Sequence, residues 1–245
     1  MFSVGALTNL LYPPACLLCR TPLPDGHPDD RVFCDDCRRR MPRIDPPVCS
    51  RCGVGLRGAF DARLLCPTCR SAPLAFDVAR SPWWYAGSAQ DAIQQFKYSR
   101  RWRIGRSFAV EMAAVARTAL PLDDVDAVLP VPLHWLKRRL KGFHPPAYLA
   151  QVVAAVLNSP YLSSASHRVR WTTTQTALGW RERFGNVDRA FAAHDALVAG
   201  RSVLLIDDVL TSGATADACA RTLKAAGARR VFLLTAARTP LSSSK

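Results

Sequence analysis

The clearest chemical pattern in this 245-residue sequence is its cysteines, eight of which lie between residues 16 and 69. They form four Cys-x-x-Cys pairs, and a gap of two residues lets one tight turn present both sulfurs of a pair to a tetrahedral ion. The spacing between successive pairs is typical of zinc knuckles joined by short hairpins. The sequence therefore predicts two structural Zn²⁺ sites with four thiolate ligands each. The expected ligands are Cys16, Cys19, Cys34, Cys37, Cys49, Cys52, Cys66 and Cys69.

Two other uses of paired cysteines are weaker. A disulfide framework needs an oxidising compartment, and the chain begins without the cationic stretch that opens a secretory signal. A redox motif needs one pair on a βαβ frame rather than four pairs in a stretch rich in proline and arginine. Spacing leaves open which pairs share an ion, and we expect adjacent pairs to do so rather than alternate pairs. The ninth cysteine, Cys219, is expected to be a small core residue of a helix.

A second stretch with chemical character runs from residue 203 to residue 215. Four apolar residues lead to Asp207 and Asp208, whose carboxylates can accept hydrogen bonds from neighbouring hydroxyls of a sugar. A small, hydroxyl-rich turn follows and exposes backbone N–H groups at a helix N-terminus, where partial positive charge favours a phosphate. Acids for a ribose beside amides for a phosphate predict a ribose-5-phosphate site.

The same stretch resembles the phosphoribosyl pyrophosphate (PRPP) signature of type I phosphoribosyltransferases. By this resemblance the PRPP-binding residues are Asp207, Asp208, Thr211, Ser212, Gly213, Ala214 and Thr215. Further segments stand in the order seen in the ComF/GntX family, namely Phe96-Lys97-Tyr98, Val131-Pro132-Leu133, Lys141-Gly142-Phe143, Thr173-Thr174-Gln175 and residues 186–191. That family joins an N-terminal zinc-binding segment to a phosphoribosyltransferase-like domain. Some of its members are associated with DNA uptake in natural transformation.

The resemblance also implies roles for residues outside this stretch. Lys137, Arg139 and Lys141 are expected to bind the pyrophosphate of PRPP with Mg²⁺, because several cations should converge on its phosphates. The expected catalytic residues are Lys97, Thr174, Gln175 and Arg181. The last three belong, with Arg168 and Arg170, to a polar stretch where type I relatives place a mobile loop that closes over the substrate. An ordinary surface loop is the alternative.

One segment departs from the family pattern. Members usually have Gly-Phe-Asn-Gln where this chain reads Gly142-Phe143-His144-Pro145. The two amide side chains are missing, and Pro145 lacks a backbone N–H group. What the amides do in relatives must be done differently here or not at all. His134 and His144 are candidate acids or bases, with surface histidines as the alternative.

The elements that must position these residues form an α/β pattern. Apolar periodicity predicts helices over residues 89–98, 104–120, 146–157 and 215–226, and strands over residues 125–131, 203–206 and 231–236. Alternating strands and helices are typical of a parallel sheet covered on both faces, which binds ligands at the carboxyl ends of its strands. The expected α/β fold is a doubly wound parallel sheet of the type I phosphoribosyltransferase type over residues 76–245. A small zinc-binding segment is expected over residues 1–75.

The formal net charge of +14, from 33 Lys+Arg against 19 Asp+Glu, predicts an anionic partner. A basic cluster of five cations contains no acid: Lys97, Arg100, Arg101, Arg103 and Arg106. It is either a solvated helix face or a surface for nucleic acid. The neighbouring Trp83, Trp84 and Trp102 could stack on unpaired bases, but packing in the core or over the active site is more common. No apolar run is long enough to span a membrane, so we expect a cytoplasmic protein.

Two hypotheses for function follow from these features. In the first, the protein displaces pyrophosphate from PRPP and transfers ribose-5-phosphate to an unknown acceptor, with positioning and charge stabilisation supplying most of the rate. In the second, the pocket is a non-catalytic sensor of PRPP or a nucleotide. The zinc segment and basic face would then hold single-stranded DNA or a competence protein partner. The missing Asn-Gln pair favours this second hypothesis.

Overall fold

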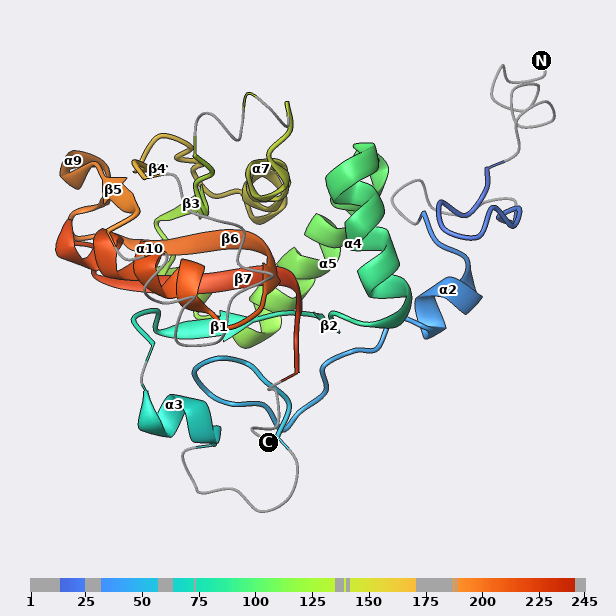
Figure 1. Cartoon of the computed structure of the whole chain (residues 1–245), viewed down its shortest axis with the longest axis horizontal. Coiled ribbons are helices and arrows are strands. Elements are labelled where there is room, and N and C mark those ends of the chain that lie inside the picture. Colours follow the sequence, from blue (N-terminus) through green and yellow to red (C-terminus); the bar gives the residue numbers. More distant parts are fainter. Residues whose placement is uncertain are drawn as a thin grey trace.

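A five-stranded parallel sheet forms the centre of the computed structural model, which describes residues 14–24, 32–56, 64–72, 74–134, 139, 142–170, 187 and 189–240. The strand order is β1-β7-β6-β3, and β2 continues the edge of the sheet by pairing with the end of β7 (Figure 1). The strands are β1 (Val78–Arg80), β2 (Trp83–Trp84), β3 (Ala127–Pro130), β6 (Ser202–Leu210) and β7 (Arg230–Arg238). β6 and β7 are nearly continuous apolar runs, as expected for central strands that are buried on both faces.

Long helices cover both faces of this sheet. They are α4 (Gly87–Ser99), α5 (Trp102–Ala119), α7 (Pro145–Leu157) and α10 (Ala214–Ala225). The first three lie on one face and α10 covers the other (Figure 1). The predicted doubly wound parallel sheet is therefore confirmed, and each of the four predicted helices begins and ends within two residues of its expected bounds.

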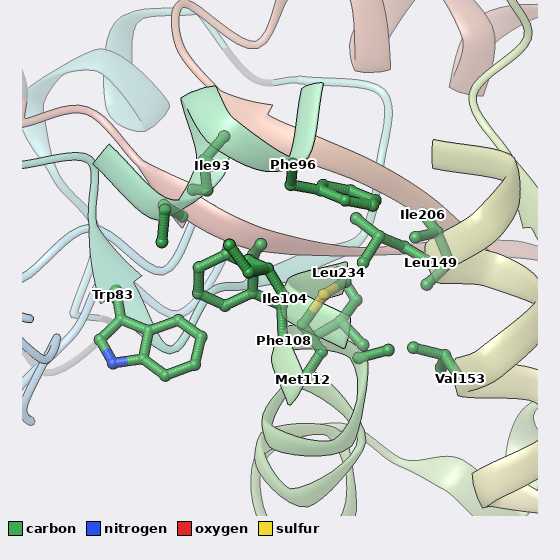
Figure 2. Packing of buried hydrophobic residues seen from close by; sticks show 14 of the residues in the cluster. Trp83, Ile93, Phe96, Ile104, Phe108, Met112, Leu149, Val153, Ile206 and Leu234 are labelled. Atoms are coloured by element: carbon green, nitrogen blue, oxygen red, sulfur yellow. The ribbon is translucent and has the colours of Figure 1, made fainter. Parts of the chain in front are cut away.

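Alternate residues of the central strands divide the core between the two faces of the sheet. Figure 2 shows Ile206 of β6 on the side where Phe108 of α5 and Leu149 of α7 pack. The preceding residue, Leu205, packs in the second cluster with α10. Cys219 of α10 is fully buried in that second cluster, so its predicted role as a core residue is confirmed.

All three predicted strands differ from their expected bounds, and β7 is longer by one residue at its start and by two at its end. β6 runs on to Leu210, so Asp207 and Asp208 lie inside the strand rather than after it. The reason is the partner strand, because β7 continues alongside and pairs with β6 as far as Leu210. β3 begins at Ala127 and ends at Pro130, so it is shorter than predicted, and a 3₁₀ turn, η1 (Leu122–Asp124), precedes it.

Several short elements lie outside the predicted pattern. β4 (Ser166–Arg168) and β5 (Phe191–Ala193) pair as an antiparallel ribbon, and α9 (Asp195–Val198) follows. Apolar periodicity needs a longer window than three or four residues, so these elements carry no signal of that kind. Arg168, expected in a mobile loop, ends β4.

The two cysteine-rich segments contact different parts of this fold. The first contains α2 (Asp35–Arg39) and lies beside α4 and α5, while the second contains α3 (Pro67–Ser71) and lies below β1 (Figure 1). Both helices follow a cysteine at the N-cap position. The predicted division of the chain at residue 75 stays a prediction. Within the described ranges, no helix has the length and hydropathy needed to cross a membrane.

Candidate active site and metal centres

The two acids of β6 meet a lysine from α4 at the end of the sheet. Lys97 Nζ lies 2.9 Å from Asp208 Oδ1, and both side chains are mostly shielded from solvent. The preceding residue, Phe96, is buried in the core and anchors this turn of α4. The structure thus pairs two residues that lie far apart in the sequence and that were both predicted to belong to the site.

A pocket of about 240 Å³ opens at this ion pair. It brings together four of the predicted site residues, which are Lys97, Asp207, Asp208 and Thr215. The remaining walls are Tyr98, Val131, Pro132, Leu133, Phe143, His144, Pro145, Pro146 and Arg168. Both cations and carboxylates face the cavity, as a ligand that carries phosphates and hydroxyl groups requires.

Electrostatics in the pocket centre on Asp207. Burial and the charge of neighbouring Asp208 raise the pKa of Asp207 to about 7. Burial acts to lower the pKa of Lys97, but the charges of Asp208 and Asp207 outweigh it, so the Lys97 pKa is raised. Burial lowers the pKa of Arg168, although the charge of Asp207 opposes this shift. The pocket therefore holds a firmly protonated lysine beside a carboxyl group that titrates near neutral pH.

The turn after β6 places backbone N–H groups at the start of α10. Gly213 is the N-cap of that helix and has a φ of +84°, in the left-handed region that glycine adopts without a Cβ clash. Ser212 Oγ accepts a hydrogen bond from the backbone N–H of Ala214 (3.4 Å). This arrangement provides the partially positive helix end that the sequence predicted for a phosphate.

The second cysteine-rich segment supports this turn from outside the sheet. The side chain of Leu74 lies against Gly213, and Arg51 Nη1 donates a hydrogen bond to the Leu74 carbonyl (2.8 Å). The backbone N–H of Ala75 donates to Asp217 Oδ1 in the first turn of α10 (2.6 Å). The predicted phosphate turn is therefore held by the segment that carries the second group of cysteines.

The segment that departs from the family pattern forms the start of α7. His144 is the N-cap residue, and its Nε2 atom lies 3.0 Å from the carbonyl oxygen of Val131. Pro145 occupies the first helical position, where the N–H group has no partner within a helix. The missing backbone donor is therefore compatible with the helix, and His144 becomes a wall of the pocket.

Two groups of four cysteines form the predicted metal centres. One group is Cys16, Cys19, Cys34 and Cys37, and the other is Cys49, Cys52, Cys66 and Cys69. Within each group the Sγ atoms all lie within 4.8 Å of one another. Four thiolates bonded at about 2.3 Å to a tetrahedral zinc ion would be about 3.8 Å apart, so the donor sets fit zinc. The predicted grouping of adjacent pairs is confirmed, since each group of four sulfurs joins two successive Cys-x-x-Cys units.

The two groups differ in their exposure to solvent. All four cysteines of the second group are buried, whereas Cys19 of the first group is exposed and Cys34 is partly exposed. The hydroxyl of Thr21 lies 3.2 Å from Cys19 Sγ, and this hydrogen bond lowers the pKa of the Cys19 thiol to about 6. A lowered pKa favours the thiolate form that a metal ion requires.

Comparison with known proteins extends these observations over the whole chain. Residues 7–70 match the model of a family described as "Double zinc ribbon domain". The DNA utilization protein YhgH of Escherichia coli (strain K12) is 32% identical over 94% of this chain and 99% of its own length. Competence protein F of Haemophilus influenzae is 27% identical over 88% of this chain and 93% of its own length. This chain belongs to the ComF/GntX family.

Solved structures also show partial likeness to this ComF/GntX chain. A glutamine PRPP amidotransferase from B. subtilis is 18% identical, with a TM-score of 0.40 over 58% of this chain and 30% of that chain. An adenine phosphoribosyltransferase is 12% identical, with a TM-score of 0.37 over 59% of this chain and 83% of that chain. The fold assignment rests on the strand order and register described above.

Other residues implied by the ComF/GntX resemblance lie away from the pocket or outside the described ranges. Arg139 lines a groove of about 1070 Å³ that shares Phe143 and His144 with the pocket. The residues outside the described ranges are Lys137, Lys141, Thr174, Gln175 and Arg181, and their roles stay predictions. Sequence reasoning missed Tyr98 as a wall of the pocket, although it stands next to Lys97 in the family motif.

The basic cluster of this ComF/GntX protein divides into members with different surroundings. Lys97 lies in the pocket, and Arg101 Nη1 donates a hydrogen bond to the Leu17 carbonyl of the first cysteine-rich segment (2.5 Å). Arg100 at the C-cap of α4 is exposed, as are Arg103 and Arg106 on α5. The cluster is therefore not one continuous solvated face, and its exposed members, which a large partner could reach, are Arg100, Arg103 and Arg106.

The tryptophans also divide between core and surface. Trp83 is buried, with its ring centroid 5.1 Å from that of Phe108, so the core alternative is confirmed for this residue. Trp83 and Trp84 are not among the described walls of the pocket, and the expectation that they cover it is wrong. Trp102 is 46% exposed and stands against Phe143 at the edge of the groove that Arg139 lines.

Proposed function

We propose that the pocket at the end of β6 binds PRPP, and that this ComF/GntX protein transfers ribose-5-phosphate from PRPP to an acceptor. The observation that carries the proposal is one pocket in which Asp207 and Asp208 face Lys97 beside the start of α10. Carboxylates suit ribose hydroxyls, helix N–H groups suit the 5′-phosphate, and cations suit the pyrophosphate. Neighbouring residues thus meet the three requirements of PRPP.

The transfer breaks the bond between C1′ and a pyrophosphate oxygen and forms a bond from C1′ to the acceptor. In this proposal Asp207 and Asp208 hold the ribose, while Lys97 and Arg168 offset the charge of the departing pyrophosphate. Mg²⁺ that arrives with PRPP would neutralise the diphosphate, and carboxylate oxygens are ligands that it prefers. On the family resemblance, we assign further roles in pyrophosphate binding and closure over the substrate to Lys137, Arg139, Lys141, Thr174, Gln175 and Arg181.

Calorimetry with PRPP and Mg²⁺ tests the binding site. The double variant Asp207→Ala with Asp208→Ala should abolish binding, since each lost charged hydrogen bond costs about 1.5–3 kcal/mol. Asp123→Ala, an exposed acid in η1, is the matched control and should bind like the wild type. Unchanged affinity in the folded double variant would show that these acids do not contact the ribose.

A non-catalytic sensor of PRPP or a nucleotide is the second candidate function. The observation that favours it is His144-Pro145 in place of the Asn-Gln pair, at the wall of the pocket. Pyrophosphate release from PRPP, with and without candidate amines and bases, separates the two functions. A sensor should bind PRPP without release, and the variant His144→Asn with Pro145→Gln is then expected to gain release.

We propose single-stranded DNA as the large anionic partner, with a competence protein as the alternative. The exposed Arg103 and Arg106 beside exposed Trp102 support a surface that combines cations with a stacking aromatic ring. Affinity should fall with salt at a slope of about −0.7 per phosphate neutralised.

Charge reversal tests this DNA surface. Arg103→Glu with Arg106→Glu should weaken binding and leave PRPP affinity unchanged. Arg229→Gln with Arg230→Gln, which removes two cations at the other end of the sheet without placing new acids beside Asp126 and Asp124, is the control. Equal DNA binding by both double variants across a salt titration would show that Arg103 and Arg106 do not contribute to DNA binding.

We also retain two proposals from the sequence about the organisation of the protein. The zinc-binding segment ends near residue 75, where the phosphoribosyltransferase-like domain begins. The protein resides in the cytoplasm, because eight thiolate ligands need a compartment that keeps them reduced.

A further inference from the structure

The two metal centres present the same chemistry to different surroundings. We infer that the first centre is a modification site for a peroxide, which oxidises Cys19 and Cys34 to a disulfide and so removes two of the four zinc ligands. The second centre resists the same oxidant. This inference does not depend on the proposed binding of PRPP.

The reacting pair in the first centre has a counterpart in the second. Cys19 Sγ and Cys34 Sγ lie 3.5 Å apart, and Cys52 Sγ and Cys66 Sγ lie 3.7 Å apart. In each centre the pair joins the last cysteine of one Cys-x-x-Cys unit to the first cysteine of the next. The distance between sulfurs is therefore nearly the same, so the difference in reactivity must come from access.

Access differs sharply between these counterparts. Cys19 is exposed and Cys34 is partly exposed, whereas Cys52 is 4% exposed and Cys66 is fully buried. An oxidant must reach a thiolate to react with it, so exposure decides which thiolates are oxidised first. The pair in the first centre meets this requirement and the pair in the second does not.

A pocket also opens onto the first centre. Its volume is about 400 Å³, and its walls include Cys19, Cys37, Arg40, Ser88 and Asp91. A peroxide is far smaller than this space, and the polar walls suit a small polar oxidant. Arg40 Nη2 donates a hydrogen bond to Cys37 Sγ (3.5 Å), which places a cation beside the same four-cysteine group.

The second centre is protected by the fold around it. Backbone N–H groups of Cys66 and Cys69 donate to the sulfurs of Cys49 (3.4 Å) and Cys66 (3.5 Å). Arg238 of β7, itself buried, donates to the carbonyl of Cys52. An oxidant could reach these sulfurs only after the second segment separates from the sheet.

The proposed reaction balances in two steps. The Cys19 thiolate attacks one oxygen of hydrogen peroxide, which forms a sulfenic acid on Cys19 and releases hydroxide. The Cys34 thiolate then attacks the Cys19 sulfur, forms the S–S bond and releases a second hydroxide. Two thiolates supply the two electrons that reduce the peroxide, and the remaining Cys16 and Cys37 are too few to keep the ion in a four-thiolate site.

Zinc release from the full-length, zinc-loaded protein tests the inference. Hydrogen peroxide is added in excess, zinc is followed with a chromogenic chelator, and disulfides are mapped by mass spectrometry after alkylation. One zinc per chain should leave about tenfold faster than the other, together with a disulfide between Cys19 and Cys34. Release of both ions at one rate, or a first disulfide at any other pair, would overturn the inference.

A pair of ligand-preserving variants sharpens this test. Cys19→His keeps four ligands in the first centre but removes one partner of the disulfide, so the fast release should disappear while the zinc content stays at two ions. Cys52→His makes the same change in the second centre and should leave the fast release unchanged. Fast zinc release that persists in Cys19→His would overturn the proposal. If Cys19→His binds less than two zinc ions, the position of the first disulfide mapped in the wild type decides whether Cys19 and Cys34 are the reacting pair.

Discussion

The two cysteine-rich segments repeat one motif, yet they are built into the protein in different ways. The first packs beside α4 and α5 and exposes Cys19, while the second buries all four cysteines in the cluster that contains β6 and α10. Contacts from the second segment reach the predicted phosphate turn through Leu74 and Ala75. Nearly identical ligand spacing therefore specifies a metal site but does not specify how strongly the rest of the fold depends on that site.

The largest expected effect comes from removing one ligand in each centre. Cys66→Ser should cost several kcal/mol of unfolding free energy, because all four cysteines of the second centre are buried, and metal binding is coupled to folding. Cys34→Ser should cost less than half as much. Urea unfolding followed by circular dichroism measures both losses, and equal losses would show that the two segments support the sheet to the same degree.

A smaller effect is expected where the second segment meets α10. Asp217 is 3% exposed, and its carboxylate accepts the Ala75 N–H and pairs with Arg221. Asp217→Ala leaves a backbone donor unsatisfied and should cost about 1–3 kcal/mol. Arg221→Ala removes the ion pair alone and should cost about 0–1 kcal/mol. If thermal unfolding gives the same loss for both variants, the link through Ala75 contributes little.

The last effect concerns Asp207, and its sign is the opposite. The pKa of Asp207 is raised from 3.8 to about 7 by burial and by Asp208, so ionisation costs folding free energy. Asp207→Asn should therefore match the wild type below pH 3.8, become relatively more stable as the pH rises to about 7, and keep that advantage above it. A shift of this size corresponds to an advantage of at most about 4 kcal/mol at high pH.

Melting temperatures between about pH 4 and pH 8 check the Asp207 prediction. Asp195→Asn, an exposed acid at the start of α9, is the control and should show no such trend. A wild type that is more stable than Asp207→Asn at pH 8 would contradict it. Together with the Asp217 result, this measurement would distinguish Asp217, whose carboxylate stabilises the fold, from Asp207, whose ionised form destabilises the fold and is proposed to serve binding.

Much of the fold could be predicted because its signals are local. Helices such as α5 and α10 show apolar residues at helical spacing, and β7 is an apolar run bounded by a glycine turn and charged residues. β1, β2 and β4 are too short to show a period, and they form because β7 or β5 offers backbone partners. A strand that forms because of a partner far away in the sequence cannot be predicted from a short stretch of the sequence.

The candidate site likewise contains residues that the sequence could predict and residues that it could not. Asp207, Asp208 and the turn at Gly213 could be predicted, because a strand, two acids and a helix start follow one another in the sequence. Arg168 and Tyr98 could not be placed in the pocket, since their positions depend on how β4 and α4 pack around the strand ends. The same packing separated Arg101 from the exposed members of the basic cluster.

The sequence alone identified eight cysteines as zinc ligands, the parallel α/β fold and the acids of the pocket, but it left open which cysteine pairs share an ion. These features depend on residue types and on short spacings between residues, and both can be read directly from the sequence. The tertiary structure alone decided that Lys97 pairs with Asp208, that Asp207 titrates near neutral pH, and that Cys19 is exposed while Cys52 is buried. Burial and charge pairing depend on neighbours in space, and segments distant in the sequence supply those neighbours.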